Sequence, residues 1–180
     1  MANYCSFDTN ISGEPEKISE LYKRLEEDGR IGFDDYDRLF DETVPEGFQW
    51  GSKWIEYSVS YGEGQDWMSI SGDTAWYPAT GLWQRISEKY ETSVDTTYSE
   101  PGGNFAGKDS WENGEKTFSE EMTYNEHLYY NDYEYFWDNI TNECVGLDLE
   151  DVIDSIGIIY EKMSDVEKQR VADIHQSENE

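Results

Sequence analysis

An aromatic-rich stretch between Phe48 and Trp83 constrains the fold more than any other part of the sequence. Five of the seven tryptophans lie in it: Trp50, Trp54, Trp67, Trp76 and Trp83. Large aromatic side chains contribute more buried surface per residue than other side chains. We therefore expect the hydrophobic core to be built around this stretch, with these five indoles packed inside it.

The net charge is the second constraint. Thirteen Lys and Arg residues stand against 41 Asp and Glu residues, which gives a formal net charge of −28. Repulsion of this size favours disorder, but the aromatic content of 16% is unlike that of disordered chains. A chain of 180 residues can bury roughly two-thirds of its unfolded surface. The sequence therefore predicts a folded, very acidic protein that needs no disulfide or metal to hold it together.

The same charge narrows the classes of partner. Phosphate binding relies on Lys and Arg, so direct binding of nucleic acid or of an anionic membrane surface is disfavoured. Cations and basic protein surfaces are favoured instead. Halophilic adaptation and simple solubility are alternatives, although the acids gather in blocks along this chain. The sequence has neither an apolar run of membrane-spanning length nor a signal peptide at its start, so we expect a cytoplasmic protein.

Hydrophobic periodicity predicts the elements of the first hundred residues. Four segments alternate apolar and polar side chains, as strands with one buried face do: residues 3–12, 55–61, 67–71 and 92–98. Residues 15–28 and 79–90 have apolar side chains three and four positions apart, as amphipathic helices do. The order is strand, helix, strand, strand, helix, strand. It predicts an α+β fold of the ferredoxin-like βαββαβ type, with an antiparallel sheet packed on two helices.

Three additions extend this fold. Asn113-Gly114 is a strong two-residue turn signal and predicts an extra hairpin over residues 105–122. Residues 26–46 form an acidic loop with one short helix. A long C-terminal helix begins after Asp148 and either runs to about Ile174 or breaks near Ser164.

The predicted domain organisation follows from these elements. Residues 1–120 form a ferredoxin-like domain that includes the acidic loop and the added hairpin. Residues 121–180 form an acidic, tyrosine-rich insert and the C-terminal helix, which we expect to pack on the same core.

Several short motifs resemble one protein family. They are Ala2–Ser6, Trp50–Trp54, Asp73–Pro78 and Gly103–Gly107. Together they are similar to the YubB-like family of phage and plasmid proteins with a ferredoxin-like domain. The resemblance covers about residues 1–120 and implies a mobile-element origin and a bacterial host. It implies no catalytic residues, and the acidic insert and acidic C-terminal helix depart from the family pattern.

Signatures of catalysis are scarce. His127 and His175 are the only histidines, and Cys5 and Cys144 fit no metal or redox spacing. A cysteine–histidine pair involving His127 has no local support. The Asp34–Asp37 segment lacks the glycine and the distal glutamate of a calcium-binding loop. We therefore predict no enzymatic activity, no cofactor and no metal site, and an enzyme that uses carboxylates or His127 is the least favoured alternative.

The distribution of charge carries the functional prediction. Between Asp109 and Asp151 there are 13 acids and a single cation, which leaves a net charge of −12. Carboxylates on a rigid hairpin or helix can imitate duplex DNA, which carries a charge about every 1.7 Å. Interleaved tyrosines are either the packed side of the insert or anchors of an interface. The predicted partner-binding residues are Glu112, Glu115, Glu120, Glu121, Glu126, Tyr129, Tyr130, Asp132, Tyr133, Glu134 and Asp138, with Asp34, Asp35 and Asp37 from the acidic loop.

These observations favour an inhibitor encoded by a mobile element. It would occupy the basic, nucleic-acid-binding surface of a host defence complex as a DNA mimic of the anti-CRISPR or anti-restriction type. The alternative is a non-catalytic adaptor or regulatory protein of a phage or plasmid, whose acidity serves solubility. Neutralising the acidic block abolishes binding in the first case and changes little in the second. The sequence does not indicate an oligomeric state.

Overall fold

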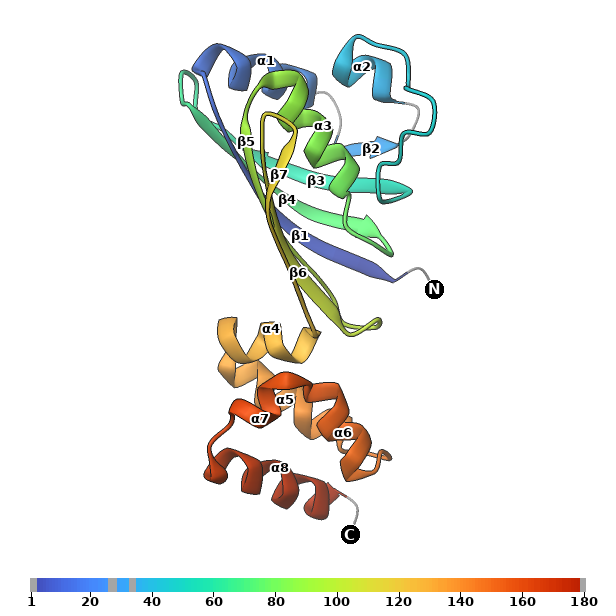
Figure 1. Cartoon of the computed structure of the whole chain (residues 1–180), viewed down its shortest axis with the longest axis vertical. Helices are drawn as coiled ribbons and strands as arrows, with labels where there is room; N and C mark the ends of the chain where they lie inside the picture. The colour runs from blue at the N-terminus through green and yellow to red at the C-terminus, as the bar shows by residue number, and fades with distance from the viewer. Residues whose placement is uncertain (1–2, 26–28, 33–34, 179–180) are drawn as a thin grey trace. The chain divides into compact units, whose positions relative to one another are not determined.

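The structure is a computed structural model that describes residues 3–25, 29–32 and 35–178. The chain divides into two compact units (Figure 1). Unit 1 comprises residues 1–102 and 107–121, and unit 2 comprises residues 103–106 and 122–180. Unit 1 carries most of a seven-stranded sheet, whereas unit 2 is mainly helical.

The sheet is built around its N-terminal strand. The strands are β1 (Tyr4–Ser12), β2 (Arg30–Gly32), β3 (Trp54–Ser60), β4 (Trp67–Ala75), β5 (Ser93–Glu100), β6 (Phe105–Glu112) and β7 (Glu115–Met122). Their spatial order is β2-β3-β4-β1-β5-β6-β7. β1 pairs antiparallel with both β4 and β5, and β3 pairs antiparallel with β4 and β2. The predicted α+β class with an antiparallel sheet is confirmed.

The helices of unit 1 are α1 (Pro15–Leu25), α2 (Tyr36–Phe40) and α3 (Thr80–Tyr90). Two of them, α1 and α3, pack on the sheet, and α2 packs on α1. α1 packs on β4 and on α3, and α3 packs on β5 (Figure 1). Every second residue of β1 is buried beneath them, as its alternating pattern predicts. The short strand β2 was not predicted, and α2 occupies the place of the predicted short helix in the acidic loop.

The five indoles of the aromatic-rich stretch are not all in the core. Trp50 and Trp83 are buried and Trp54 is half-buried, but Trp67 and Trp76 are 42% and 48% exposed. The buried positions of β4 begin one residue after Trp67, so its own side chain points to the opposite face of the sheet. Trp76 follows the end of β4 in a turn with φ of 73°. The expectation that all five are packed inside is therefore wrong for these two.

Unit 2 has a hydrophobic core of its own. Its helices are α4 (Tyr124–Asn131), α5 (Tyr133–Glu143), α6 (Leu149–Ile156), α7 (Ile158–Lys162) and α8 (Asp165–Glu178). All five contribute to one buried cluster: Leu128, Phe136, Trp137, Ile140, Cys144, Val152, Ile156, Ile159, Met163 and Val171. No helix in the described part of the chain combines the length and apolar character needed to span a membrane.

The prediction of one long C-terminal helix is wrong, because three helices occupy this segment. α6 stops at Gly157, whose φ of 69° and ψ of −147° lie outside the helical region. The second break is at Met163, whose backbone is extended. α8 then begins at Asp165, and the Ser164 hydroxyl just before it donates a hydrogen bond to the Glu167 carboxylate. A break near Ser164 was one of the two predicted outcomes. The apolar positions that suggest one continuous face instead meet a common core from three directions.

Candidate functional site

Four of the predicted partner-binding acids lie on the β6–β7 hairpin: Glu112, Glu115, Glu120 and Glu121. All four are exposed, and β7 is exposed on both faces from Glu115 to Glu121. β7 is also the outermost strand at its side of the sheet. The turn is the predicted Asn113-Gly114, whose φ values of 51° and 86° suit a two-residue hairpin. The hairpin thus presents these carboxylates to solvent.

The acids predicted in the 26–46 loop are only partly available. Asp34 lies outside the described residues. The Asp35 carboxylate accepts a hydrogen bond from the Gly32 amide at 2.7 Å and lies 3.5 Å from the Arg38 Nε. Asp37 is exposed in the first turn of α2. Asp35 therefore holds the loop together, and Asp37 is the exposed acid of the pair.

Two predicted acids of unit 2 are engaged in capping helices. The Glu126 side chain is buried and takes part in a capping box with Thr123 at the start of α4. The Asp132 carboxylate accepts a hydrogen bond from the Tyr135 amide at 3.1 Å and caps α5. Glu134 and Asp138, by contrast, are exposed on α5. Sequence spacing alone does not separate these two roles, although the Thr-x-x-Glu motif is a recognisable signal for the first.

The predicted tyrosines belong to a polar cluster centred on Glu167. Tyr129 and Tyr133 donate hydrogen bonds from their hydroxyls to Glu167 Oε1, at 3.1 and 2.9 Å. Hydrogen bonds from the Ser164 hydroxyl and amide, together with these two, lower the pKa of Glu167 to about 2. Tyr130 is 60% exposed and packs edge-on against Tyr129. Two of the three tyrosines thus join α4 and α5 to α8, and the third faces solvent.

Unit 2 leaves most of its negative charge uncompensated. Residues 122–180 contain 15 acids and three cations, Lys162, Lys168 and Arg170. None of the three forms an ion pair with an acid in the part of the unit that the structure describes. Lys168 lies over the Tyr160 ring at 5.6 Å, and Arg170 lies over the Trp137 ring at 4.1 Å.

Ion pairs are instead concentrated in unit 1. There, Arg85 and Lys89 both pair with Glu42, and Lys116 pairs with the buried Asp109. Unit 2 therefore differs from unit 1 in composition, and also in that its cations form no ion pairs within the described residues.

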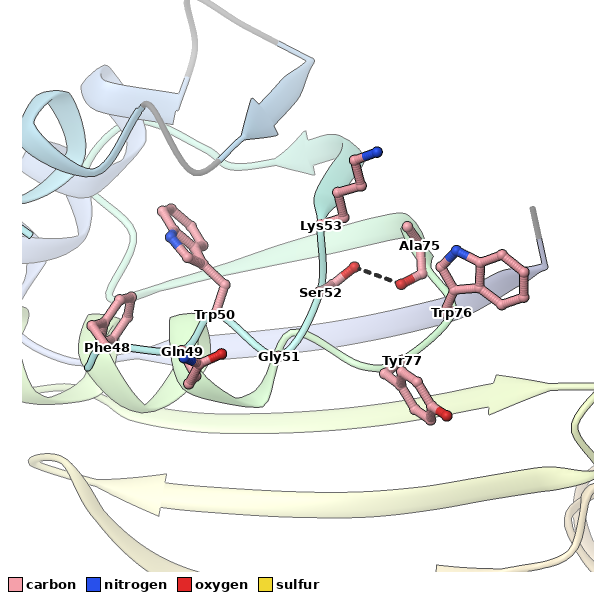
Figure 2. A pocket seen from close by; sticks show the side chains of 9 residues that line it. All are labelled: Phe48, Gln49, Trp50, Gly51, Ser52, Lys53, Ala75, Trp76 and Tyr77. Carbon is pink, nitrogen blue, oxygen red and sulfur yellow. Dashed lines mark hydrogen bonds between the residues drawn. The ribbon is translucent and has the colours of Figure 1, made fainter.

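A pocket of about 390 Å³ in unit 1 was not predicted from the sequence. Two segments line it, residues 48–53 and residues 75–77 (Figure 2). The Ser52 hydroxyl joins the segments by donating a hydrogen bond to the Ala75 carbonyl at 2.9 Å. The first segment also crosses α3 closely, because a Cβ on Gly81 would lie 1.8 Å from the Gln49 carbonyl oxygen. Only a glycine fits at that crossing.

Trp76 sits in this pocket in a strained backbone conformation. Its φ is 73°, and the amide of Tyr77 donates to the carbonyl of Ala75 across it at 2.9 Å. An i→i+2 hydrogen bond around a positive φ is the arrangement of a classic γ-turn, which is rare and strained. Three further hydrogen bonds hold the turn: the Trp76 amide donates to the Asn3 carbonyl, and the Thr74 hydroxyl donates to the Tyr77 and Cys5 carbonyls.

The cysteines and histidines occupy structural environments. Burial raises the pKa of the Cys5 thiol to about 11 and also raises that of Cys144. His127 stacks on Tyr124, and Nε2 of His175 lies 3.1 Å from the Leu147 carbonyl oxygen. Among the described residues, no group of three or more His, Cys, Asp or Glu side chains is placed to hold a metal ion.

A match to a protein-family model supports the fold. A family model described as the ferredoxin-like domain in Api92-like protein matches residues 56–138. Among solved structures, the chain is similar to the crystal structure of a protein api92 from Yersinia pseudotuberculosis, with 20% identity and a TM-score of 0.33. That similarity covers 49% of this chain and 29% of the other, so it spans less than a third of the api92 chain. No curated protein sequence matches.

The family match begins in β3 and ends in α5. It does not confirm the resemblance of the sequence motifs to the YubB-like family of phage and plasmid proteins. The chain contains a ferredoxin-like domain similar to that of Api92-like proteins.

Proposed function

We propose that the protein is a non-catalytic inhibitor encoded by a mobile element, and that it binds the basic, nucleic-acid-binding surface of a host defence complex. The target would be a CRISPR effector complex or a restriction enzyme, so the protein would be an inhibitor of the anti-CRISPR or anti-restriction type. The observation that carries the proposal is the uncompensated charge of unit 2, in which 15 acids accompany three cations that form no ion pair within the described residues.

The packed core of unit 2 supports an electrostatic decoy. Glu134 and Asp138 on α5, Asp154 on α6 and Asp173 on α8 are exposed, and each is carried by a helix that contributes to one buried core. Fixed carboxylates do not lose side-chain and backbone freedom to the same extent as those of a disordered tail. Their docking on Lys and Arg releases counterions, which is the same source of affinity that duplex DNA has.

The β6–β7 hairpin offers a second acidic surface on unit 1. Glu115, Glu120 and Glu121 are exposed on β7, the outermost strand at its side of the sheet. We propose that this strand contributes to binding as a separate site, because its charges are carried by a different unit from those of α5, α6 and α8.

We also propose a finer account of the ferredoxin-like domain. The strands β1, β3, β4 and β5 with α1 and α3 would be its βαββαβ core, and β2, α2 and the β6–β7 hairpin would be additions. The neighbour order β3-β4-β1-β5 within the sheet supports this division.

A competition experiment tests the inhibitory function. A labelled DNA duplex is bound to a purified CRISPR effector complex or restriction endonuclease, and its displacement by this protein is followed by fluorescence anisotropy. We expect displacement at about 50 mM salt that weakens by an order of magnitude or more at about 300 mM salt. Displacement that does not depend on salt would contradict the electrostatic mechanism.

Matched charge reversals locate the binding surface. The test variant changes Glu134, Asp138, Asp154 and Asp173 to Lys, and leaves Glu126 and Asp132 intact because both cap helices. The control variant reverses four exposed acids of unit 1 outside the predicted surface, namely Glu16, Glu46, Glu63 and Asp66. Both variants shift the net charge equally. We expect the test variant to lose at least about tenfold in competition and the control to lose little, whereas equal losses would indicate a bulk charge effect.

A second candidate function is that of a protein–protein adaptor. The exposed aromatic rings of Tyr130 and Tyr133 on unit 2 favour it, since tyrosine is enriched among the anchors of interfaces. Binding that survives the reversal of the four unit 2 acids but is lost on replacing Tyr130 by Ala would support the adaptor.

A further inference from the structure

We infer that the pocket between residues 48–53 and 75–77 of unit 1 is a binding site for a small planar aromatic ligand that carries a negative charge. The inference is independent of the proposed inhibitory function, because the pocket contributes none of the residues of either acidic surface.

The size and lining of the pocket are those of a small-molecule site. Its volume of about 390 Å³ lies within the usual range for such sites. Four aromatic side chains line it, namely Phe48, Trp50, Trp76 and Tyr77. Phe48 and Trp50 belong to a packed aromatic cluster with Tyr36, with ring centroids 5.0 to 6.2 Å apart. They form a fixed wall, whereas Trp76 and Tyr77 are 48% and 64% exposed.

In Figure 2 the two pairs of rings lie on opposite sides of the Ser52–Ala75 hydrogen bond. Phe48 and Trp50 are on one side of the view, and Trp76 and Tyr77 are on the other. A flat ligand ring in the pocket can contact the rings of either pair. Offset or edge-to-face contacts with a ligand ring then add to the burial of apolar surface.

The turn at Trp76 is fixed before any ligand arrives. A bulky residue at φ of 73° is strained, and such strain persists only where the surrounding structure over-determines it. Hydrogen bonds from Ser52 and Tyr77 converge on the Ala75 carbonyl, and one from Thr74 satisfies the Tyr77 carbonyl. Close packing at Gly51 also restricts the turn, because a Cβ there would lie 2.5 Å from the Pro78 carbonyl oxygen. The turn therefore holds two large aromatic rings toward solvent, at a position where glycine would relieve the strain.

The charge of the lining indicates the charge of the ligand. Acids make up 41 of the 180 residues, yet none of the nine residues that line the pocket is an acid. The one charged residue in the lining is Lys53, which is exposed and forms no ion pair with any acid in the described ranges. Gln49 adds an amide donor and Tyr77 a hydroxyl. A carboxylate or phosphate attached to an aromatic ring would pair with the Lys53 ammonium, whereas a cationic substituent would meet Lys53 unfavourably.

A matched series of probes tests whether the pocket binds an aromatic ring and whether it prefers a negatively charged ligand. Indole-3-acetate, indole-3-acetamide and tryptamine share one ring and differ in the charge of the side chain. Binding is measured by calorimetry on the full chain in about 0.3 M salt, which screens the long-range repulsion between the acidic protein and an anion. We expect indole-3-acetate to bind with a Kd below about 1 mM and tryptamine to bind at least about tenfold more weakly.

Two pairs of variants assign the binding to this pocket. Trp76→Ala is compared with Trp67→Ala, since both indoles are similarly exposed but only the first lines the pocket. Lys53→Gln is compared with Lys108→Gln, since neither lysine forms an ion pair within the described residues. We expect Trp76→Ala to weaken indole-3-acetate about tenfold and Trp67→Ala to change it less than about twofold. Lys53→Gln should weaken indole-3-acetate but not indole-3-acetamide.

The outcomes that overturn the inference are equally specific. Equal effects of Trp76→Ala and Trp67→Ala would remove the site from this pocket. Tryptamine binding as tightly as indole-3-acetate would remove the assignment of charge. A lack of measurable binding for the whole series would remove the site itself. Adenosine monophosphate and adenosine are titrated in parallel, and preference for the nucleotide over indole-3-acetate would identify phosphate rather than carboxylate as the anionic group.

Discussion

Thr123 and Glu126 satisfy each other at the start of α4. The Glu126 amide donates to the Thr123 hydroxyl oxygen at 3.1 Å, and the Thr123 amide donates to the Glu126 carboxylate at 2.7 Å. Two amides that have no partner inside the helix are thereby bonded. Glu126 thus has a local task in the fold that its membership of an acidic block does not reveal.

Replacing Glu126 by Ala is expected to destabilise unit 2. The change leaves the half-buried Thr123 amide without its acceptor, and the loss should be about 1 kcal/mol or slightly more. Asp138→Ala is the matched control, because it removes the same charge from an exposed position on α5. The control should stay within about 0.5 kcal/mol of the parent protein in urea unfolding followed by circular dichroism. Equal losses in the two variants would show that charge, and not capping, is responsible.

The hydrogen-bonded cluster around Glu167 makes stability depend on pH. The pKa of Glu167 is lowered from 4.5 to about 2, first by the Ser164 side chain. A lowered folded-state pKa means that the stabilisation is fully present above about pH 4.5 and is lost as the pH falls toward about 2. Because the group is partly exposed to solvent, we expect a contribution of about 1 kcal/mol at pH 7.

The comparison of the parent protein with Glu167→Gln isolates this contribution. Acid also reduces the general repulsion among carboxylates, but that effect is nearly the same in both proteins. The difference in unfolding free energy should therefore be largest near neutral pH and should shrink between about pH 5 and about pH 3. A difference that stays constant over this range would mean that the ionised carboxylate is not the stabilising species.

The strain at Trp76 predicts an inverted preference between Ala and Gly. In ordinary strand positions Ala is more favourable than Gly, but a φ of 73° is readily adopted only by Gly. Trp76→Gly should therefore be more stable than Trp76→Ala by about 1 kcal/mol. The same pair of substitutions at Trp67, inside β4, should show the opposite order. Thermal unfolding of the four variants gives the comparison.

The crossing of residue 49 over α3 predicts a severe effect of a single methyl group. Ala normally stabilises a helix relative to Gly by about 1 kcal/mol. At Gly81, however, the added Cβ would lie 1.8 Å from the backbone oxygen of Gln49, so the two segments must separate. We expect Gly81→Ala to cost about 2 kcal/mol or more. At Gly32 the nearest atom to an added Cβ is 3.8 Å away, so Gly32→Ala should be tolerated.

Local patterns predicted every strand of the sheet except β2, but not the exposure of every side chain. The alternation of β1 and the turn at Asn113-Gly114 depend on neighbouring residues only, and both appear as predicted. Trp67 could have been assigned correctly from the same alternation, because Met68 begins the buried series. Trp76 could not, since its conformation depends on hydrogen bonds with residues as distant in sequence as Asn3.

The candidate sites show the same division. Acidic segments are visible in the sequence, but charge alone does not separate Glu126, which caps α4, from the exposed Glu134; the Thr-x-x-Glu motif was the signal that could have done so. The prediction of one long C-terminal helix was wrong because hydrophobic spacing alone does not reveal that α6 ends at Gly157, whose φ is 69°. The aromatic pocket was missed for a third reason: its two segments are about 25 residues apart in the sequence, and a hydrogen bond from the Ser52 side chain to the Ala75 carbonyl joins them.

The central position of β1 has a consequence for synthesis on the ribosome. β1 lies between β4 and β5, yet it precedes both in the chain, and the last residue of β5 is Glu100. Residues 4–12 therefore have no partner in the sheet until β4 has been translated to Ala75, and their second edge stays unpaired until β5 ends at Glu100. Their exposed alternate positions are mostly Ser, Asp and Asn, which keeps this waiting segment from pairing with other nascent chains.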